Sequence, residues 1–181
     1  QGGLGTPALL SDSLYDCHVA DDVVVAPTTS QKKRVIRIPH TYFCADLAAY
    51  RELSTPKKPV TRAAYGLRES AVVLCCANRP HKVEPEVFAS WLRALEQLEE
   101  EEDVQLWVLQ HPEAARDDND RVVFADRVSR REHLARLALA DVALDTRIYG
   151  SHTLACDYAW AGVPLVTVDD AREPWHRRVG T

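Results

Sequence analysis

The sequence contains no methionine among its 181 residues, and no apolar run approaches the roughly 18 to 20 residues that cross a bilayer. The first residues also lack the basic and then apolar order of a secretory signal. We therefore expect a cytoplasmic or nuclear protein with no membrane partner. Because the chain opens on Gln1 and stops at Thr181, just after a helix-like stretch at 172–179, we expect both ends to be cut from a longer protein.

The sequence also has fewer basic than acidic residues, which gives a formal net charge of −5. This balance argues against a protein whose main partner is nucleic acid or an anionic membrane surface, so any phosphate must bind at a local site. The five cysteines are odd in number and show no Cys-x-x-Cys spacing. With Cys75 and Cys76 adjacent in an apolar run, we expect reduced and mostly buried thiols.

Motifs of several enzyme classes are missing as well. No Gly-x-Gly-x-x-Gly, Walker A or Gly-x-Ser-x-Gly pattern occurs, which disfavours dehydrogenases, nucleoside triphosphatases and serine hydrolases.

From residue 70 onward, short β-branched apolar runs alternate with longer helical stretches. Such alternation is typical of βαβ units on a parallel sheet and predicts a doubly wound, Rossmann-like α/β lobe. Pro85 suits the first turn of a helix, and Gly162 suits the turn after one. The expected strands are 71–76, 104–109, 121–124, 141–144 and 164–168, and the expected helices are 85–100, 130–139 and 151–161.

Residues 1–60 are less regular, with one expected strand at 34–38. The stretch Ser-Thr-Pro-Lys-Lys-Pro at 54–59 has the composition of a linker. We therefore expect a boundary there, dividing the chain into 1–60 and 61–181.

Polar side chains follow three of the expected strands at their carboxyl ends. In an open parallel sheet, ligands bind at this edge, and phosphates favour the starts of the helices that follow. These polar side chains are Arg79 and Lys82; Arg130, His133 and Arg136, with the apolar Val128 before them; and Ser151, His152, Thr153 and Asp157.

Each group has a chemical role available to it. Free N–H groups at Ser151 to Thr153 can receive a diphosphate, and Asp157, one turn later, can accept hydrogen bonds from ribose hydroxyls. Lys82 can stabilise charge on a departing phosphate. Alternatively, Ser151 and Thr153 only cap a helix, Asp157 and Lys82 are surface residues, and the basic residues after 124 form a wet helix face.

Three motifs then identify a family resemblance: Ala-Asp-Val-Ala-Leu-Asp-Thr at 140–146, Gly-Ser-His-Thr at 150–153 and Trp-Ala-Gly-Val-Pro at 160–164. Over nearly its whole length the chain resembles the catalytic region of the protein O-GlcNAc transferase and SPINDLY family. The resemblance implies an incomplete C-terminal lobe of a two-lobed GT-B glycosyltransferase, with residues 1–60 forming the end of the N-terminal lobe.

The resemblance also implies inverting, metal-independent transfer of GlcNAc from UDP-GlcNAc to Ser or Thr of acceptor proteins, with no cofactor. Because the family's remaining lobe and tetratricopeptide repeats have no counterpart here, we expect these 181 residues to be inactive alone. By position, Lys82 matches the family's diphosphate-contacting lysine, which is needed for turnover, and Asp157 matches its ribose-binding aspartate. His152 and Thr153 match the start of its diphosphate-binding helix. The positions that match the family's uridine contacts are Val128, Arg130, His133 and Arg136.

Two departures bear on the donor. The family often has an amide at the position of Arg79 and a second threonine at that of Leu154, so both are expected near the donor. A GDP-fucose-dependent protein O-fucosyltransferase therefore stays open as an alternative, as does a non-catalytic fragment that binds a nucleotide or a partner.

Asp118-Asn119-Asp120 matches the Asp-x-Asp pattern with which many glycosyltransferases hold a metal. It lies in a polar loop before a strand, at the wrong edge of the sheet, so we predict a turn and no metal. The Glu-x7-Glu spacing of many retaining glycosyltransferases is missing after Gly150.

Overall fold

The computed structural model describes residues 16–21, 34–41, 43–56, 59–98, 102–110, 120–147 and 149–168. The expected helix at 172–179 and most of the Asp-x-Asp motif, Asp118 and Asn119, lie outside these residues.

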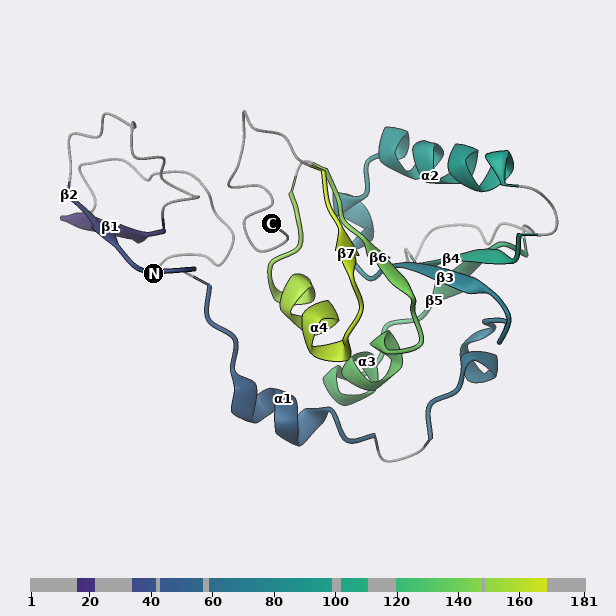
Figure 1. Cartoon of the computed structure of the whole chain (residues 1–181), viewed down its shortest axis with the longest axis horizontal. Helices are drawn as coiled ribbons and strands as arrows, with labels where there is room; N and C mark the ends of the chain where they lie inside the picture. The colour runs from purple at the N-terminus through teal and green to yellow at the C-terminus, as the bar shows by residue number, and fades with distance from the viewer. Residues whose placement is uncertain are drawn as a thin grey trace.

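A five-stranded parallel sheet forms the centre of the molecule and confirms the predicted α/β class (Figure 1). Its order is β5-β4-β3-β6-β7, so the chain builds outward from β3 in one direction and from β6 in the other. The crevice between the carboxyl ends of β3 and β6 is therefore the point where such sheets bind ligands. The strands are β3 (Val72–Cys76), β4 (Val104–Leu109), β5 (Val122–Ala125), β6 (Val142–Leu144) and β7 (Leu165–Val166).

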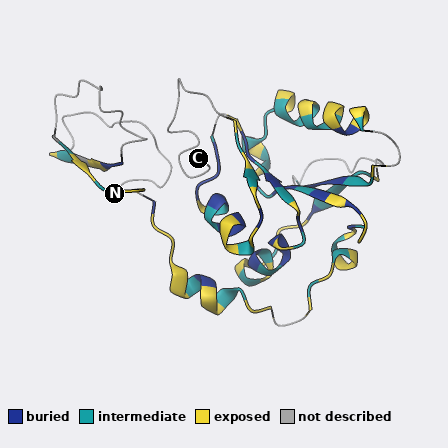
Figure 2. Cartoon of the chain, viewed as in Figure 1, coloured by how far each residue is buried: buried dark blue, intermediate teal, exposed yellow. Residues whose placement is uncertain are grey.

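Helices cover both faces of this sheet because its strands are apolar on both sides. On one face, Leu74 and Cys76 pack with α2 (Pro85–Gln97), whose only buried residue is Leu95 (Figure 2). On the other face, Val73 and Cys75 pack with α3 (Arg130–Leu137) and α4 (Thr153–Ala161). Figure 1 shows α2 across the sheet from α3 and α4.

The helices begin and end at the expected signals, with small shifts. Pro85 opens α2, Ser129 caps α3 by accepting from the Glu132 N–H, and Gly162 ends α4 at a left-handed φ of 76°. The expected start of α4 at 151 is wrong by two residues: His152 is the N-cap, and Ser151 belongs to the preceding loop, where its N–H donates to the Asp145 carboxylate. The expected end of α3 at 139 and the expected span 164–168 for the last strand were too long.

Before the main sheet lie elements that the sequence only partly indicated. The predicted strand at 34–38 is β2 (Arg34–Arg37), which pairs in parallel with the unpredicted β1 (Cys17–Ala20). The helix α1 (Leu47–Leu53) was also missed. Short 3-10 turns, η1 (Arg62–Tyr65) and η2 (Pro80–Lys82), flank β3.

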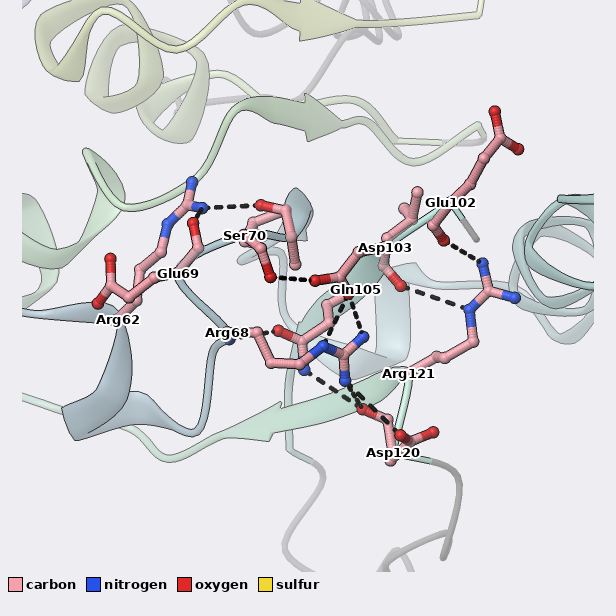
Figure 3. Close-up of polar contacts among 12 residues, drawn as sticks. Arg62, Arg68, Glu69, Ser70, Glu102, Asp103, Gln105, Asp120 and Arg121 are labelled. Carbon is pink, nitrogen blue, oxygen red and sulfur yellow. Dashed lines mark hydrogen bonds and ion pairs between the residues drawn. The ribbon is translucent and has the colours of Figure 1, made fainter. Parts of the chain in front are cut away.

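A polar network fastens the amino ends of β3, β4 and β5 (Figure 3). The buried Gln105 side chain accepts from the Arg68 N–H at 2.7 Å and donates to the Asp120 carbonyl at 3.3 Å. The Arg68 guanidinium donates to Asp103 at 2.7 Å, and its hydrogen bond is the first cause of a lowered Asp103 pKa. This edge is therefore closed by its own side chains and lies opposite the carboxyl edge.

All five cysteines are free thiols. Cys75 and Cys76 are buried, and burial raises the pKa of Cys76 to about 11. The expectation of mostly buried thiols is wrong for Cys44, which is exposed. Among the described residues, no helix is both long and apolar enough to cross a membrane.

Candidate functional site

A cavity of about 670 Å³ opens at the carboxyl edge of the main sheet, within the roughly 300 to 1,000 Å³ of ligand pockets. Its wall is formed by the segments that follow β3, β5 and β6, together with Leu109 at the end of β4. The structure brings all ten sequence-predicted site residues together here: Arg79, Lys82, Val128, Arg130, His133, Arg136, His152, Thr153, Leu154 and Asp157. The lining is completed by Ala77, Asn78, His81, Leu109, Arg127 and Tyr149.

The charge of this cavity opposes that of the chain as a whole. Five lysine and arginine side chains line it, whereas Asp157 is the sole carboxylate among its lining residues. The formal net charge of the chain is −5. Such a local positive field in an acidic protein favours an anionic ligand.

Lys82 lies at the end of η2, directly after β3. Its ammonium is 3.5 Å from the Gly150 carbonyl and 4.3 Å from the centre of the Tyr149 ring. Burial lowers the pKa of Lys82, and Arg79 lowers it further, while Asp145 opposes both. The alternative that Lys82 is simply exposed is therefore wrong: its ammonium is half-buried and held between two groups.

A buried aspartate shapes the loop between β6 and α4. The Asp145 carboxylate accepts from the Thr146 N–H at 2.8 Å, the Ser151 N–H at 2.7 Å and the Thr167 hydroxyl at 3.0 Å. The Asn78 amide donates to the Ser151 hydroxyl at 2.8 Å. The loop is thus fastened both to β7 and to the end of β3.

The start of α4 faces the cavity without a side-chain cap. Its N-cap residue, His152, makes no capping hydrogen bond, and Ser151 is engaged elsewhere, so the capping alternative is wrong for Ser151. The first-turn N–H groups at Thr153 and Leu154 have no acceptor within the helix, as at any helix start, and the N-cap side chain does not satisfy them, which is the condition in which helix starts bind anions. Thr153 is exposed, in keeping with access from solvent.

His152 is buried beside this helix start. Its Nδ1 lies 3.2 Å from the Gly150 carbonyl, and since a carbonyl oxygen only accepts, Nδ1 carries the proton. Burial lowers the pKa of His152. The lowered pKa favours the neutral ring near pH 7.

Asp157 forms the floor of the cavity and is fully buried, so the alternative that it is a surface residue is wrong. Arg130 donates two hydrogen bonds of 2.5 Å to its carboxylate, and His133 Nε2 lies 3.4 Å from Oδ2. Tyr50 of α1 donates to Oδ1. Burial alone would raise the pKa of Asp157, but the hydrogen bonds from Arg130, His133 and Tyr50 outweigh it and lower that pKa.

Arg136 is only 3% exposed, so the alternative that it belongs to a solvent-exposed helix face is wrong. Its guanidinium lies 5.4 Å from the Trp107 ring and 5.7 Å from the Tyr65 ring. One terminal nitrogen, Nη1, has no hydrogen-bond partner among the described residues. Burial lowers its pKa, and a buried guanidinium left with an unmet donor is a natural partner for a ligand oxygen.

Sequence reasoning missed Tyr50 and gave Tyr149 no role. Tyr149 follows β6 in a loop that the sequence did assign to this edge, so position alone could have suggested it. Tyr50 had no such signal, because it precedes the expected linker and lies 107 residues from Asp157.

Within the described ranges, no cluster of three or more His, Cys, Asp or Glu residues could hold a metal. Asp120, the described member of the Asp-x-Asp motif, lies just before β5 at the amino edge, where Arg68 and Gln105 contact it.

Comparison with known proteins gives consistent matches. The family described as Glycosyl transferase family 41 matches residues 34–179. A probable UDP-N-acetylglucosamine–peptide N-acetylglucosaminyltransferase SEC of Arabidopsis thaliana is 28% identical over 91% of this chain and 18% of its own length. The UDP-N-acetylglucosamine–peptide N-acetylglucosaminyltransferase of Caenorhabditis elegans is 33% identical over 60% of this chain and 10% of its own length.

Among solved structures, a mutant O-GlcNAc transferase of Thermobaculum terrenum superposes with a TM-score of 0.58. It is 24% identical, and the match covers 90% of this chain and 31% of that one. This likeness supports the fold. The chain spans less than a fifth of the length of these two curated relatives.

Proposed function

The chain belongs to glycosyl transferase family 41, and from this membership we propose that it is the donor-binding part of a transferase that moves GlcNAc from UDP-GlcNAc to serine or threonine of acceptor proteins. The observation that carries the proposal is the cavity at the carboxyl edge, where a cationic wall, an uncapped helix start and one buried carboxylate converge. These are the groups that a nucleoside diphosphate requires.

The diphosphate is assigned to the side of the cavity formed by η2 and α4. Free N–H groups at the start of α4 and the Lys82 ammonium supply positive charge there, and Arg79 adds to it. No metal is then needed to neutralise the phosphates, because fixed protein groups meet the same charge.

The reaction follows from this placement. The acceptor hydroxyl attacks the anomeric carbon from the face opposite the diphosphate and releases its proton to water. The bond from that carbon to the β-phosphate oxygen breaks, and the configuration inverts. The electron pair stays on the departing phosphate, where the Lys82 ammonium stabilises it. Lys82 thereby acts on the transition state more than on the bound donor.

The nucleoside is assigned to the side formed by α3. The unmet N–H of Arg136 suits a carbonyl oxygen of the base, with Val128 and His133 beside it. Asp157 suits the ribose hydroxyls, since a carboxylate accepts from both at once. Leu154 keeps a backbone N–H for the diphosphate while offering no hydroxyl.

Calorimetry with UDP and GDP, each in EDTA, tests the proposal on this chain. We expect UDP to bind without metal and more tightly than GDP. Tighter binding of GDP would favour a fucosyl donor, and binding that requires added manganese would overturn the metal-independent site. If neither nucleotide binds, the cavity has another ligand.

A further inference from the structure

Tyr50 lies outside the cavity but reaches its floor. It is the buried residue of α1, only 6% exposed, and its hydroxyl donates to Oδ1 of Asp157. Tyr50 is absent from the residues that line the cavity, so it contacts the carboxylate without being part of the cavity wall.

Several contacts hold α1 in this place. The Tyr50 ring lies 5.2 Å from the Trp160 ring of α4, and the Trp160 indole donates to the Ser54 hydroxyl at 2.5 Å. Arg131 of α3 donates to the Glu52 carbonyl at 2.8 Å and to the Thr55 carbonyl at 3.0 Å. The position of the Tyr50 hydroxyl is thus fixed by contacts to α3 and α4, the two helices that line the cavity.

The Asp157 carboxylate has no acceptor position to spare in this arrangement. Oδ1 accepts from Tyr50 and Arg130, while Oδ2 accepts from Arg130 and lies near His133. Each carboxylate oxygen offers about two acceptor sites, so a ribose must take the place of an existing donor. The Arg130 side chain is 41% exposed and can swing out, whereas the buried Tyr50 cannot.

We propose that Tyr50 is a positioning residue for the nucleotide site: it pins the Asp157 carboxylate while Arg130 yields its place to the ribose hydroxyls. This inference rests on the proposed function. It assigns part of the donor site to α1, a helix that precedes the linker-like stretch of the sequence.

The test measures how tightly this chain and its variants bind UDP and 2′,3′-dideoxy-UDP, which lacks both ribose hydroxyls. Because Tyr50 acts through a hydrogen bond to a charged group, Tyr50→Phe should weaken UDP about tenfold. The affinity of Tyr50→Phe for dideoxy-UDP should stay within about twofold of that of the unchanged chain. Tyr65→Phe is the matched control, since it also removes a tyrosine hydroxyl that donates to a carboxylate, in this case that of Glu132 on α3. It should change the affinity for neither ligand.

The outcomes separate the two claims. If Tyr50→Phe weakens both ligands equally, Tyr50 only supports the fold, and the inference is overturned. If UDP binds and Tyr50→Phe leaves it unchanged, the inference again fails while the proposed function stands. If the unchanged chain binds no UDP, both fail together.

Discussion

The Asn78 amide donates to the Ser151 hydroxyl at 2.8 Å, across 73 residues of sequence. Both side chains are essentially inaccessible to solvent. Asn78 follows β3 and Ser151 precedes α4, so this hydrogen bond spans the crevice where the order of the sheet reverses. It links the segment that carries Lys82 to the helix start that the proposal assigns to the same diphosphate.

In a complete two-lobed enzyme that contains these residues, Lys82→Ala should reduce turnover by about 10² to 10³, or roughly 2.7 to 4 kcal/mol in the barrier, the scale for losing one charge stabiliser. Donor binding should weaken much less, because the lysine acts on charge that develops in the transition state. Steady-state kinetics with UDP-GlcNAc measure both quantities. Arg93→Ala, which removes an exposed cation from α2, is the control. Equal losses in turnover and binding would make Lys82 an ordinary binding residue.

Arg136→Met should separate binding from stability. The change removes a buried cation with an unmet N–H while keeping much of the side-chain volume, so the free energy of unfolding should stay the same or rise. UDP affinity should fall at least about tenfold, since a hydrogen bond from a charged donor is lost. Calorimetry and urea denaturation on the same samples decide the matter. A large loss of stability with unchanged affinity would assign Arg136 to the core instead.

Asp157→Asn should change how stability depends on pH. The folded state lowers the pKa of this carboxyl, so its contribution to stability is present above the unfolded value of roughly 3.9 and is lost as the pH falls through the lower, folded value. The free energy of unfolding of the unchanged chain should therefore exceed that of the variant most at neutral pH, and this difference should narrow below about pH 4. Urea denaturation between pH 7 and pH 3 measures the gap. A gap independent of pH would contradict the ion pair with Arg130.

Gln105→Leu should destabilise the fold by about 1 to 3 kcal/mol, because the Arg68 N–H and the Asp120 carbonyl lose their buried partner. UDP affinity should persist at 25 °C, since the network lies at the opposite edge of the sheet from the cavity. Gln97→Leu, at the exposed last residue of α2, should change stability by less than about 0.5 kcal/mol. Thermal unfolding compares the two. Equally small effects of the two substitutions would show that the polar network adds little to the stability of the fold.

Local patterns predicted the main sheet well for a physical reason. Strands such as Val104–Leu109 are largely buried on both faces and therefore read as apolar runs, interrupted in this one by Gln105, while Pro85 and Gly162 mark the start of one helix and the end of another. The carboxyl-edge rule then located the site, since every parallel strand delivers its following loop to the same side. By contrast, α1 and β1 are short and carry weak periodicity, and neither was predicted.

The sequence by itself determined the class of sheet and the edge where the cavity opens, because these depend on apolar periodicity and on where strands end. Most of the candidate residues at that edge followed from the same rule, and Leu154 came from the family resemblance. Tertiary structure alone decided which polar side chains are buried and what they contact. Arg136 and Gln105 look like surface residues in sequence but are 3% and 2% exposed. The meeting of Tyr50 and Asp157 depends on how α1 packs against α3 and α4, and packing between distant segments leaves no periodic trace in either one.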